Sequence, residues 1–96
     1  MTDGAVRGGA ASTAASLLAA VGGGENVQAL THCWARLRFV LKDRAAVDHA
    51  TVTALPEVAI AVDQQGQYQV ALRAGLLETY DELITLINEH QEDHHG

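Results

Sequence analysis

The chain contains one cysteine, Cys33, which lies three residues before Arg36 and five residues before Arg38. The nucleophilic form of cysteine is the thiolate, and an unperturbed thiol is mostly protonated near neutral pH. Cations beside a thiol favour the thiolate, and guanidinium groups also bind phosphate oxygens through paired hydrogen bonds. The spacing therefore predicts a site at which Cys33 holds a phosphoryl group.

The residues after the cysteine alternate between polar and apolar types, which indicates a half-buried strand at about 36–42. Arg36 and Arg38 then point to the same face of that strand. The segment 32–35 forms the turn that connects this strand to a shorter one at 27–31. Backbone N–H groups of such a turn add further donors for an anion.

The other elements follow from apolar periodicity and from their stop signals. They are a helix from residue 12 or 13 to 21 that stops at Gly22–Gly24, a helix capped by Asp48 and closed before Pro56, strands at 58–62 and 67–72 around the hairpin segment 63–66, and a helix at about 75–88. The order α-β-β-α-β-β-α predicts an α+β sandwich in which three helices cover a four-stranded antiparallel sheet.

Length and composition restrict the domain organisation and the function classes. With 96 residues the chain holds one domain, which we assign to 13–89 with flexible tails at 1–12 and 90–96. The net charge of −6 disfavours nucleic-acid binding. No apolar run reaches the length of a membrane span, and a single free thiol suits a reducing cytoplasm. We expect no metal and no cofactor, because the histidines at 90, 94 and 95 lie in a polar tail without cysteine.

Five sequence blocks occur in a fixed order: Gly22-Gly23, Glu25-Asn26-Val27, Leu30-Thr31-His32-Cys33, Arg36-Leu37-Arg38-Phe39 and Gly66-Gln67-Tyr68-Gln69-Val70. From about residue 16 to 87 the chain resembles the IIB domain of the bacterial phosphoenolpyruvate-dependent sugar phosphotransferase system, of the glucose and β-glucoside type. The resemblance implies that Cys33 accepts a phosphoryl group from a phosphohistidine of the IIA component. It also implies that the group passes to a sugar entering through the membrane IIC component, and that Arg36 and Arg38 bind it.

The resemblance also predicts which residues surround the site. The environment of the thiolate and phosphate is assigned to Thr31, His32, Trp34 and Ala35, and a partner surface to Trp34, Gly66 and Gln67. The family commonly has threonine where this chain has Ala35, so a regulatory or interaction domain without phosphotransfer stays the alternative. The resemblance implies a cytoplasmic place at the inner face of the membrane, through IIC, and leaves the sugar open. The small exposed area and the transient role suggest a monomer.

Overall fold

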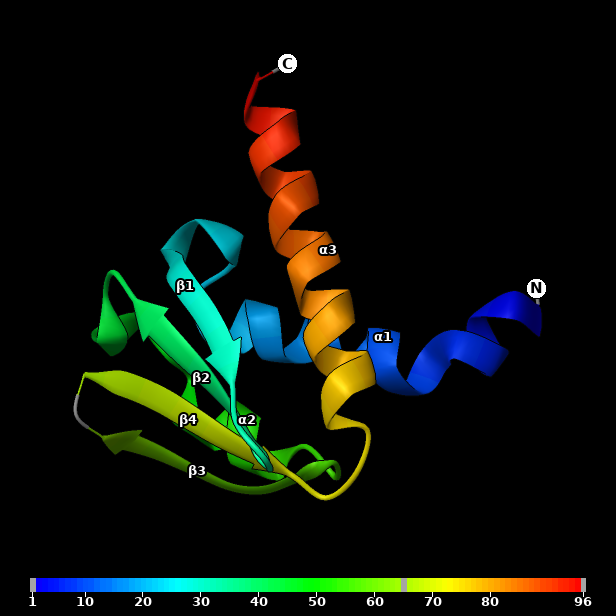
Figure 1. The fold of residues 1–96 in the computed structure, drawn as a ribbon, viewed down its shortest axis with the longest axis horizontal. Helices are drawn as coiled ribbons and strands as arrows, with labels where there is room; N and C mark the ends of the chain where they lie inside the picture. The colour runs from blue at the N-terminus through cyan, green and yellow to red at the C-terminus, as the bar shows by residue number, and fades with distance from the viewer. Residues whose placement is uncertain (1, 65, 96) are drawn as a thin grey trace.

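A computed structural model describes the backbone of residues 2–64 and 66–95, and the side chains of residues 9–64 and 66–89. Within these ranges the fold contains three α-helices and a four-stranded antiparallel sheet (Figure 1). The helices are α1 (Thr2–Ala20), α2 (His49–Ala54) and α3 (Leu76–His95), and the strands are β1 (Val27–His32), β2 (Arg36–Leu41), β3 (Val58–Gln64) and β4 (Gln67–Leu72). The predicted α+β class and the element order are confirmed.

The sheet has the strand order β1-β2-β4-β3, so the two hairpins meet through β2 and β4. Alternate residues of β2, among them Leu37 and Phe39, are fully buried and belong to the same core cluster as buried residues of all three helices. The helices therefore cover one face of the sheet. The period of two leaves Arg36 and Arg38 on the opposite face.

Both long helices extend further than the sequence pattern indicated. Helix α1 begins at Thr2 and not at residue 12 or 13, and α3 continues to His95 and not to residue 88. Apolar periodicity marks only the turns that contact the core, so it does not predict how far a helix continues beyond them. The assignment of 1–12 and 90–96 as flexible tails stays a prediction; residues 1 and 96 lie outside the described residues.

Two glycines end α1, as predicted. Gly22 and Gly23 adopt positive φ angles of 106° and 88°, and the N–H of Gly23 donates to the carbonyl of Leu18 at 2.8 Å. A Cβ atom at Gly22 would lie 2.7 Å from the side-chain nitrogen of Asn26. Glycine is needed at position 22 both for its backbone conformation and for the space that Asn26 occupies.

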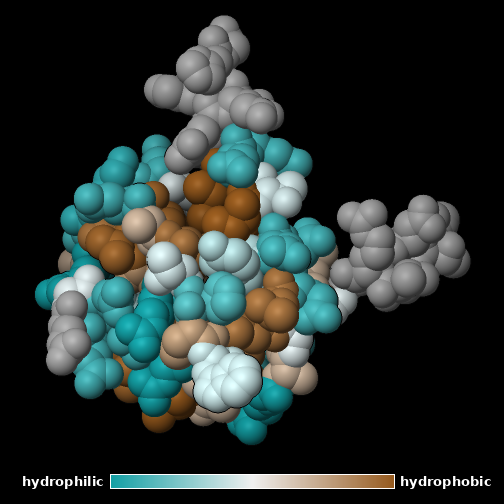
Figure 2. Space-filling model, in the orientation of Figure 1, coloured by the Kyte–Doolittle hydropathy of each residue, from teal (hydrophilic) through white to brown (hydrophobic). Residues whose placement is uncertain are grey.

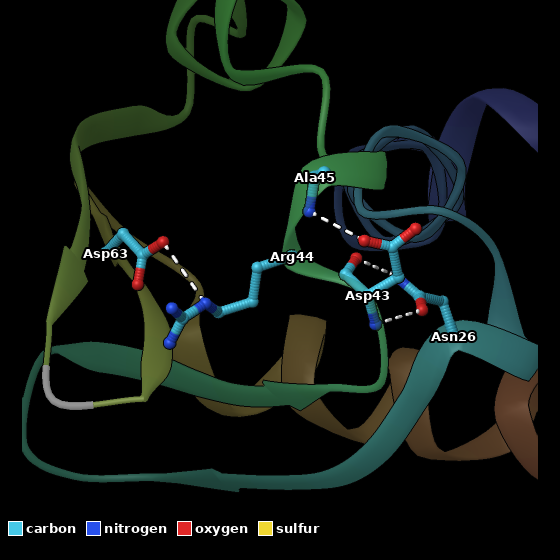
Figure 3. Close-up of polar contacts among 5 residues, drawn as sticks. All are labelled: Asn26, Asp43, Arg44, Ala45 and Asp63. Carbon is cyan, nitrogen blue, oxygen red and sulfur yellow. Dashed lines mark hydrogen bonds and ion pairs between the residues drawn. The ribbon is translucent and has the colours of Figure 1, made fainter.

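Asn26 is a buried polar residue that joins the end of α1 to the segment after β2. Its Nδ2 donates to the carbonyls of Val21 at 2.8 Å and Asp43 at 2.9 Å, and its Oδ1 accepts from the N–H of Asp43 at 2.9 Å. The pairing with Asp43 lies beside the turn η2 (Arg44–Ala46), where Arg44 also pairs with Asp63 (Figure 3). One side chain thus satisfies three backbone groups.

Replacing Asn26 with alanine is expected to lower the free energy of unfolding by about 3 kcal/mol, because three backbone groups lose their partner and each unpaired buried group is costly. Urea unfolding followed by circular dichroism measures the change. Asn88, which is exposed on α3, provides the matched control. Asn88→Ala should change stability by less than about 0.5 kcal/mol, and an equal loss in both variants would contradict this role of Asn26.

Of the two remaining turn signals, the cap of α2 is found where expected, whereas the β3–β4 turn differs from its prediction. The carboxylate of Asp48 accepts from the N–H of Thr51 at 3.2 Å and caps α2. The β3–β4 turn is tighter than expected, because β3 continues to Gln64, which pairs with Gln67. Gln65, in that turn, lies outside the described residues. Within the described residues no helix is both long and apolar enough to cross a bilayer.

Candidate functional site

Cys33 lies in the tight turn between β1 and β2. Its backbone N–H donates to the carbonyl of Arg36 at 3.0 Å, which closes the turn, and the N–H of Leu72 donates to the carbonyl of Ala35 at 3.4 Å. The second bond connects the turn to the end of β4. The thiol is free and partly exposed, so a reaction partner can reach it.

The turn meets α3 as well as β4. Figure 1 shows the β1–β2 turn, the end of β4 and the first turn of α3 at the same end of the molecule. A shallow hollow of about 390 Å³ is lined there by His32, Cys33, Trp34, Leu76, Leu77 and Glu78. The first turn of α3 therefore forms one wall of the hollow beside the thiol, and it contributes the acidic Glu78 as well as the apolar Leu76 and Leu77.

Arg36 and Arg38 are half-buried on the open face of β2, as the alternation predicted. Each guanidinium donates to a glutamine amide of the neighbouring strand β4. The Nη1 of Arg36 lies 3.0 Å from the Oε1 of Gln69, and the Nη1 of Arg38 lies 3.4 Å from the Oε1 of Gln67. The Nε of Arg38 is buried and has no hydrogen-bond partner among the described residues.

The surroundings of Cys33 favour the thiolate. The side chain of Arg38, followed by the backbone N–H groups of Ala35 and Arg36, lowers the pKa of the Cys33 thiol from its ordinary value of 9.0 to about 7. Desolvation of the thiol acts in the opposite direction and raises its pKa. A large fraction of the thiol is therefore ionised near neutral pH, and among these contributions Arg36 acts through its backbone.

The other predicted environment residues lie on both sides of the turn. Thr31 pairs with Arg38 across β1 and β2 and shares its face of the sheet. His32 points to the helix side, where its ring packs edge-on against Tyr80 with centroids 4.6 Å apart, and its Nδ1 donates to the carbonyl of Cys33 at 3.1 Å. Ala35 adds no hydroxyl group to the turn. His32 is the last residue of β1 and not part of the turn itself, and its role in the thiol environment stays a prediction.

The three residues predicted as one partner surface do not lie together. Trp34 is 95% exposed in the Cys33 turn, whereas Gly66 lies in the β3–β4 turn, at the opposite end of β4. The side chain of Gln67 reaches Arg38 by a hydrogen bond. The neighbours of Trp34 are instead Leu76 and the 58%-exposed Leu77, from α3.

Sequence reasoning missed Gln69 and Leu77 as parts of this region. Gln67 and Gln69 are two residues apart on a predicted strand, which indicated that they share a face of the sheet. The sequence pattern does not reveal, however, that β4 pairs with β2. Leu77 fitted the apolar periodicity of a core helix and is exposed beside the thiol. The side chains of the histidines at 90, 94 and 95 lie outside the described residues, so the prediction that they bind no metal stays a prediction.

Comparison with known proteins gives concordant findings. Residues 15–48 match the family model described as phosphotransferase system, EIIB. The chain is 39% identical over 77 residues to the arbutin-, cellobiose-, and salicin-specific EIIBC component of Escherichia coli (strain K12), covering 80% of this chain and 16% of that protein. It is 36% identical over 83 residues to the sucrose-specific EIIBC component of Bacillus subtilis (strain 168), covering 85% and 18%.

A solved structure is similar over most of both chains. One domain of the PTS system IIabc component from Clostridium difficile superposes with a TM-score of 0.74 and 31% identity, over 80% of this chain and 81% of that chain. The chain spans less than a fifth of the length of the curated relatives, at 16% and 18%. The similarity therefore concerns one domain of those longer proteins.

Proposed function

The chain belongs to the EIIB family of the phosphotransferase system, and from that premise we propose that it carries a phosphoryl group on Cys33. Membership supports a role as a component of a sugar phosphotransferase. The observation that carries the assignment to Cys33 is the partly exposed thiol with a pKa of about 7, lowered chiefly by Arg38. A nucleophile ionised near neutral pH needs no separate base.

In the accepting step the thiolate of Cys33 attacks the phosphorus of a phosphohistidine on an IIA component. The S–P bond forms as the N–P bond breaks, and the imidazole leaves with the electron pair of that bond. Arg36 and Arg38 bind the phosphoryl oxygens and stabilise the charge on them during transfer.

In the donating step the S–P bond breaks and an O–P bond forms to a sugar hydroxyl, while the thiolate of Cys33 is regenerated. The hydroxyl proton passes to a group outside this chain. The relatives are EIIBC components named for arbutin, cellobiose and salicin and for sucrose. We therefore propose that the acceptor is a sugar held by a membrane IIC component, which selects the sugar.

The partners and the location follow from the same proposal. The domain works on the cytoplasmic side of the membrane, attached through IIC, and receives its phosphoryl group from IIA. It acts as a monomer that meets each partner briefly, and its net charge of −6 disfavours nucleic acid as a partner.

Intact mass measurement tests the proposal. The protein is incubated with phosphoenolpyruvate, the general phosphotransferase components and a cognate IIA, and we expect the gain of one phosphoryl group. Peptide mapping must assign that group to the segment with Cys33, because the chain also contains five histidines. A folded protein that gains nothing beside an active IIA would refute the carrier function and favour the regulatory alternative.

Trp34 is proposed as a contact for the IIA component. Its ring is 95% exposed beside the thiol and, with Leu76 and Leu77, borders the hollow at the Cys33 turn. Figure 2 shows apolar and polar residues intermixed on the face that carries α3. Such a surface suits a transient interface, where exposed aromatic residues contribute strongly to binding.

Replacing Trp34 with alanine is expected to raise the KM for phosphorylated IIA by about tenfold, because buried interface aromatics commonly contribute more than 1 kcal/mol. Stability and the pH profile of thiol alkylation should not change, since the side chain contacts little of its own domain. Ile60, 48% exposed on β3, supplies the control Ile60→Ala. Equal KM values for both variants would disprove the contact.

A further inference from the structure

The two arginines of the site are held by a pair of neutral amides, and Gln67 is the residue that joins them. Its Oε1 accepts from the Nη1 of Arg38 at 3.4 Å and from the Nε2 of Gln69 at 3.1 Å. Gln69 in turn accepts from the Nη1 of Arg36 at 3.0 Å. The carbonyl oxygen of an amide has two lone pairs, so the Oε1 of Gln67 can accept both hydrogen bonds, from Arg38 and from Gln69.

The backbone explains this arrangement. Gln67 and Gln69 are two residues apart on β4 and point to the same face. The register pairs Arg38 with Gln69 across β2 and β4, so the amides and the guanidinium groups lie side by side on the open face. Gln69 is buried, which limits the positions that its amide can take.

The hydrogen-bond partners of Arg36 and Arg38 are neutral amides, which preserve the positive charge of both guanidinium groups. Among the described side chains no carboxylate lies within 4.0 Å of the guanidinium of Arg36 or Arg38, and the ion pair of Arg44 with Asp63 lies elsewhere. An amide oxygen orients a guanidinium but cancels none of its charge. Both positive charges stay available for a phosphoryl group, and that of Arg38 also for the thiolate.

We propose that Gln67 is a positioning residue for phosphoryl transfer: it fixes Arg38 directly, and Arg36 through Gln69, while leaving both guanidinium groups fully charged. The proposal rests on the proposed carrier function of Cys33. It predicts that a carboxylate at position 67, which has nearly the same shape as the amide, slows phosphoryl acceptance because it neutralises Arg38. It also predicts that an apolar residue at position 67 slows phosphoryl acceptance, because the hydrogen bond that orients Arg38 is lost.

Gln67→Glu and Gln67→Leu test the proposal in two assays. The first assay measures kcat and KM for phosphoryl acceptance from phosphorylated IIA, and the second measures the rate of Cys33 alkylation by iodoacetamide against pH. For Gln67→Glu we expect kcat to fall by about tenfold with KM nearly unchanged. We also expect the alkylation midpoint to rise by about one pH unit, because a new negative charge offsets Arg38.

Gln67→Leu separates orientation from charge. It removes the acceptor without adding a charge, so we expect the fall in kcat with a much smaller shift of the alkylation midpoint. Gln28→Glu, at an exposed position of β1, is the control for the added charge and should match the wild type in both assays. Urea unfolding of every variant checks that a loss of kcat is not a loss of folded protein.

The outcomes distinguish this proposal from the carrier function itself. A wild type that accepts no phosphoryl group overturns the carrier function, and with it the positioning role. A wild type that accepts the group while both Gln67 variants keep its kcat overturns the role of Gln67 alone. An alkylation midpoint in Gln67→Glu equal to that of Gln28→Glu overturns the charge argument.

Discussion

Replacing Cys33 with serine is expected to abolish phosphoryl acceptance from IIA. Serine keeps the size of the side chain but replaces the thiol by a hydroxyl, which stays protonated near neutral pH beside Arg38. The wild-type thiol, with a pKa of about 7, is ionised in the same place. In the intact-mass experiment the wild type should gain one phosphoryl group and Cys33→Ser none, a difference between near completion and background.

The control for this experiment is His32, the neighbour of Cys33 in the chain, because an imidazole is also a side chain that can carry a phosphoryl group. His32 packs against Tyr80 on the helix side and faces away from Arg36 and Arg38. His32→Gln should therefore still gain one phosphoryl group at completion. If Cys33→Ser gained the group instead and His32→Gln did not, the carrier would be the imidazole and not the thiol.

The sequence allowed the local part of the site to be predicted, because that part belongs to a single hairpin. The alternation after Cys33 predicted that Arg36 and Arg38 share a face and that the cysteine lies in the preceding turn, and both are observed. These are consequences of strand geometry, which depends on neighbouring residues only. The roles of these residues in catalysis remain predictions.

The parts that sequence reasoning missed depend on contacts between distant segments. Alternation predicted two hairpins but not that β2 and β4 would be the adjacent strands. That pairing brings Gln69 against Arg36 and leaves Gly66 at the far end of β4, away from Trp34. Likewise, periodicity does not reveal which residue at the start of α3 remains uncovered, and Leu77 is exposed there. Tertiary packing decides both points.

Replacing Arg38 with methionine is expected to affect the thiol and the transfer together. Arg38 makes the largest contribution to the lowered pKa of Cys33, so its loss should move the alkylation midpoint from about 7 towards 9.0. Less of the thiol is then ionised at neutral pH, and alkylation there becomes slower. Phosphoryl acceptance should fall further, by about 10²–10³-fold, because a charged donor to the transferring group is also lost.

Lys42→Met supplies the matched control, because it removes the same charge from the residue that follows β2 at the end away from Cys33. Its alkylation midpoint and its acceptance rate should stay close to those of the wild type, since the charges of exposed residues are screened over about 10 Å. Comparing the two variants separates the effect of a guanidinium in contact with the thiol from the effect of the net charge of the domain. If both variants shifted the midpoint equally, the general field of the domain, and not the guanidinium beside the thiol, would set the pKa of Cys33. If Arg38→Met alone shifted it but accepted phosphoryl groups at the wild-type rate, Arg38 would activate the thiol without binding the group in transit.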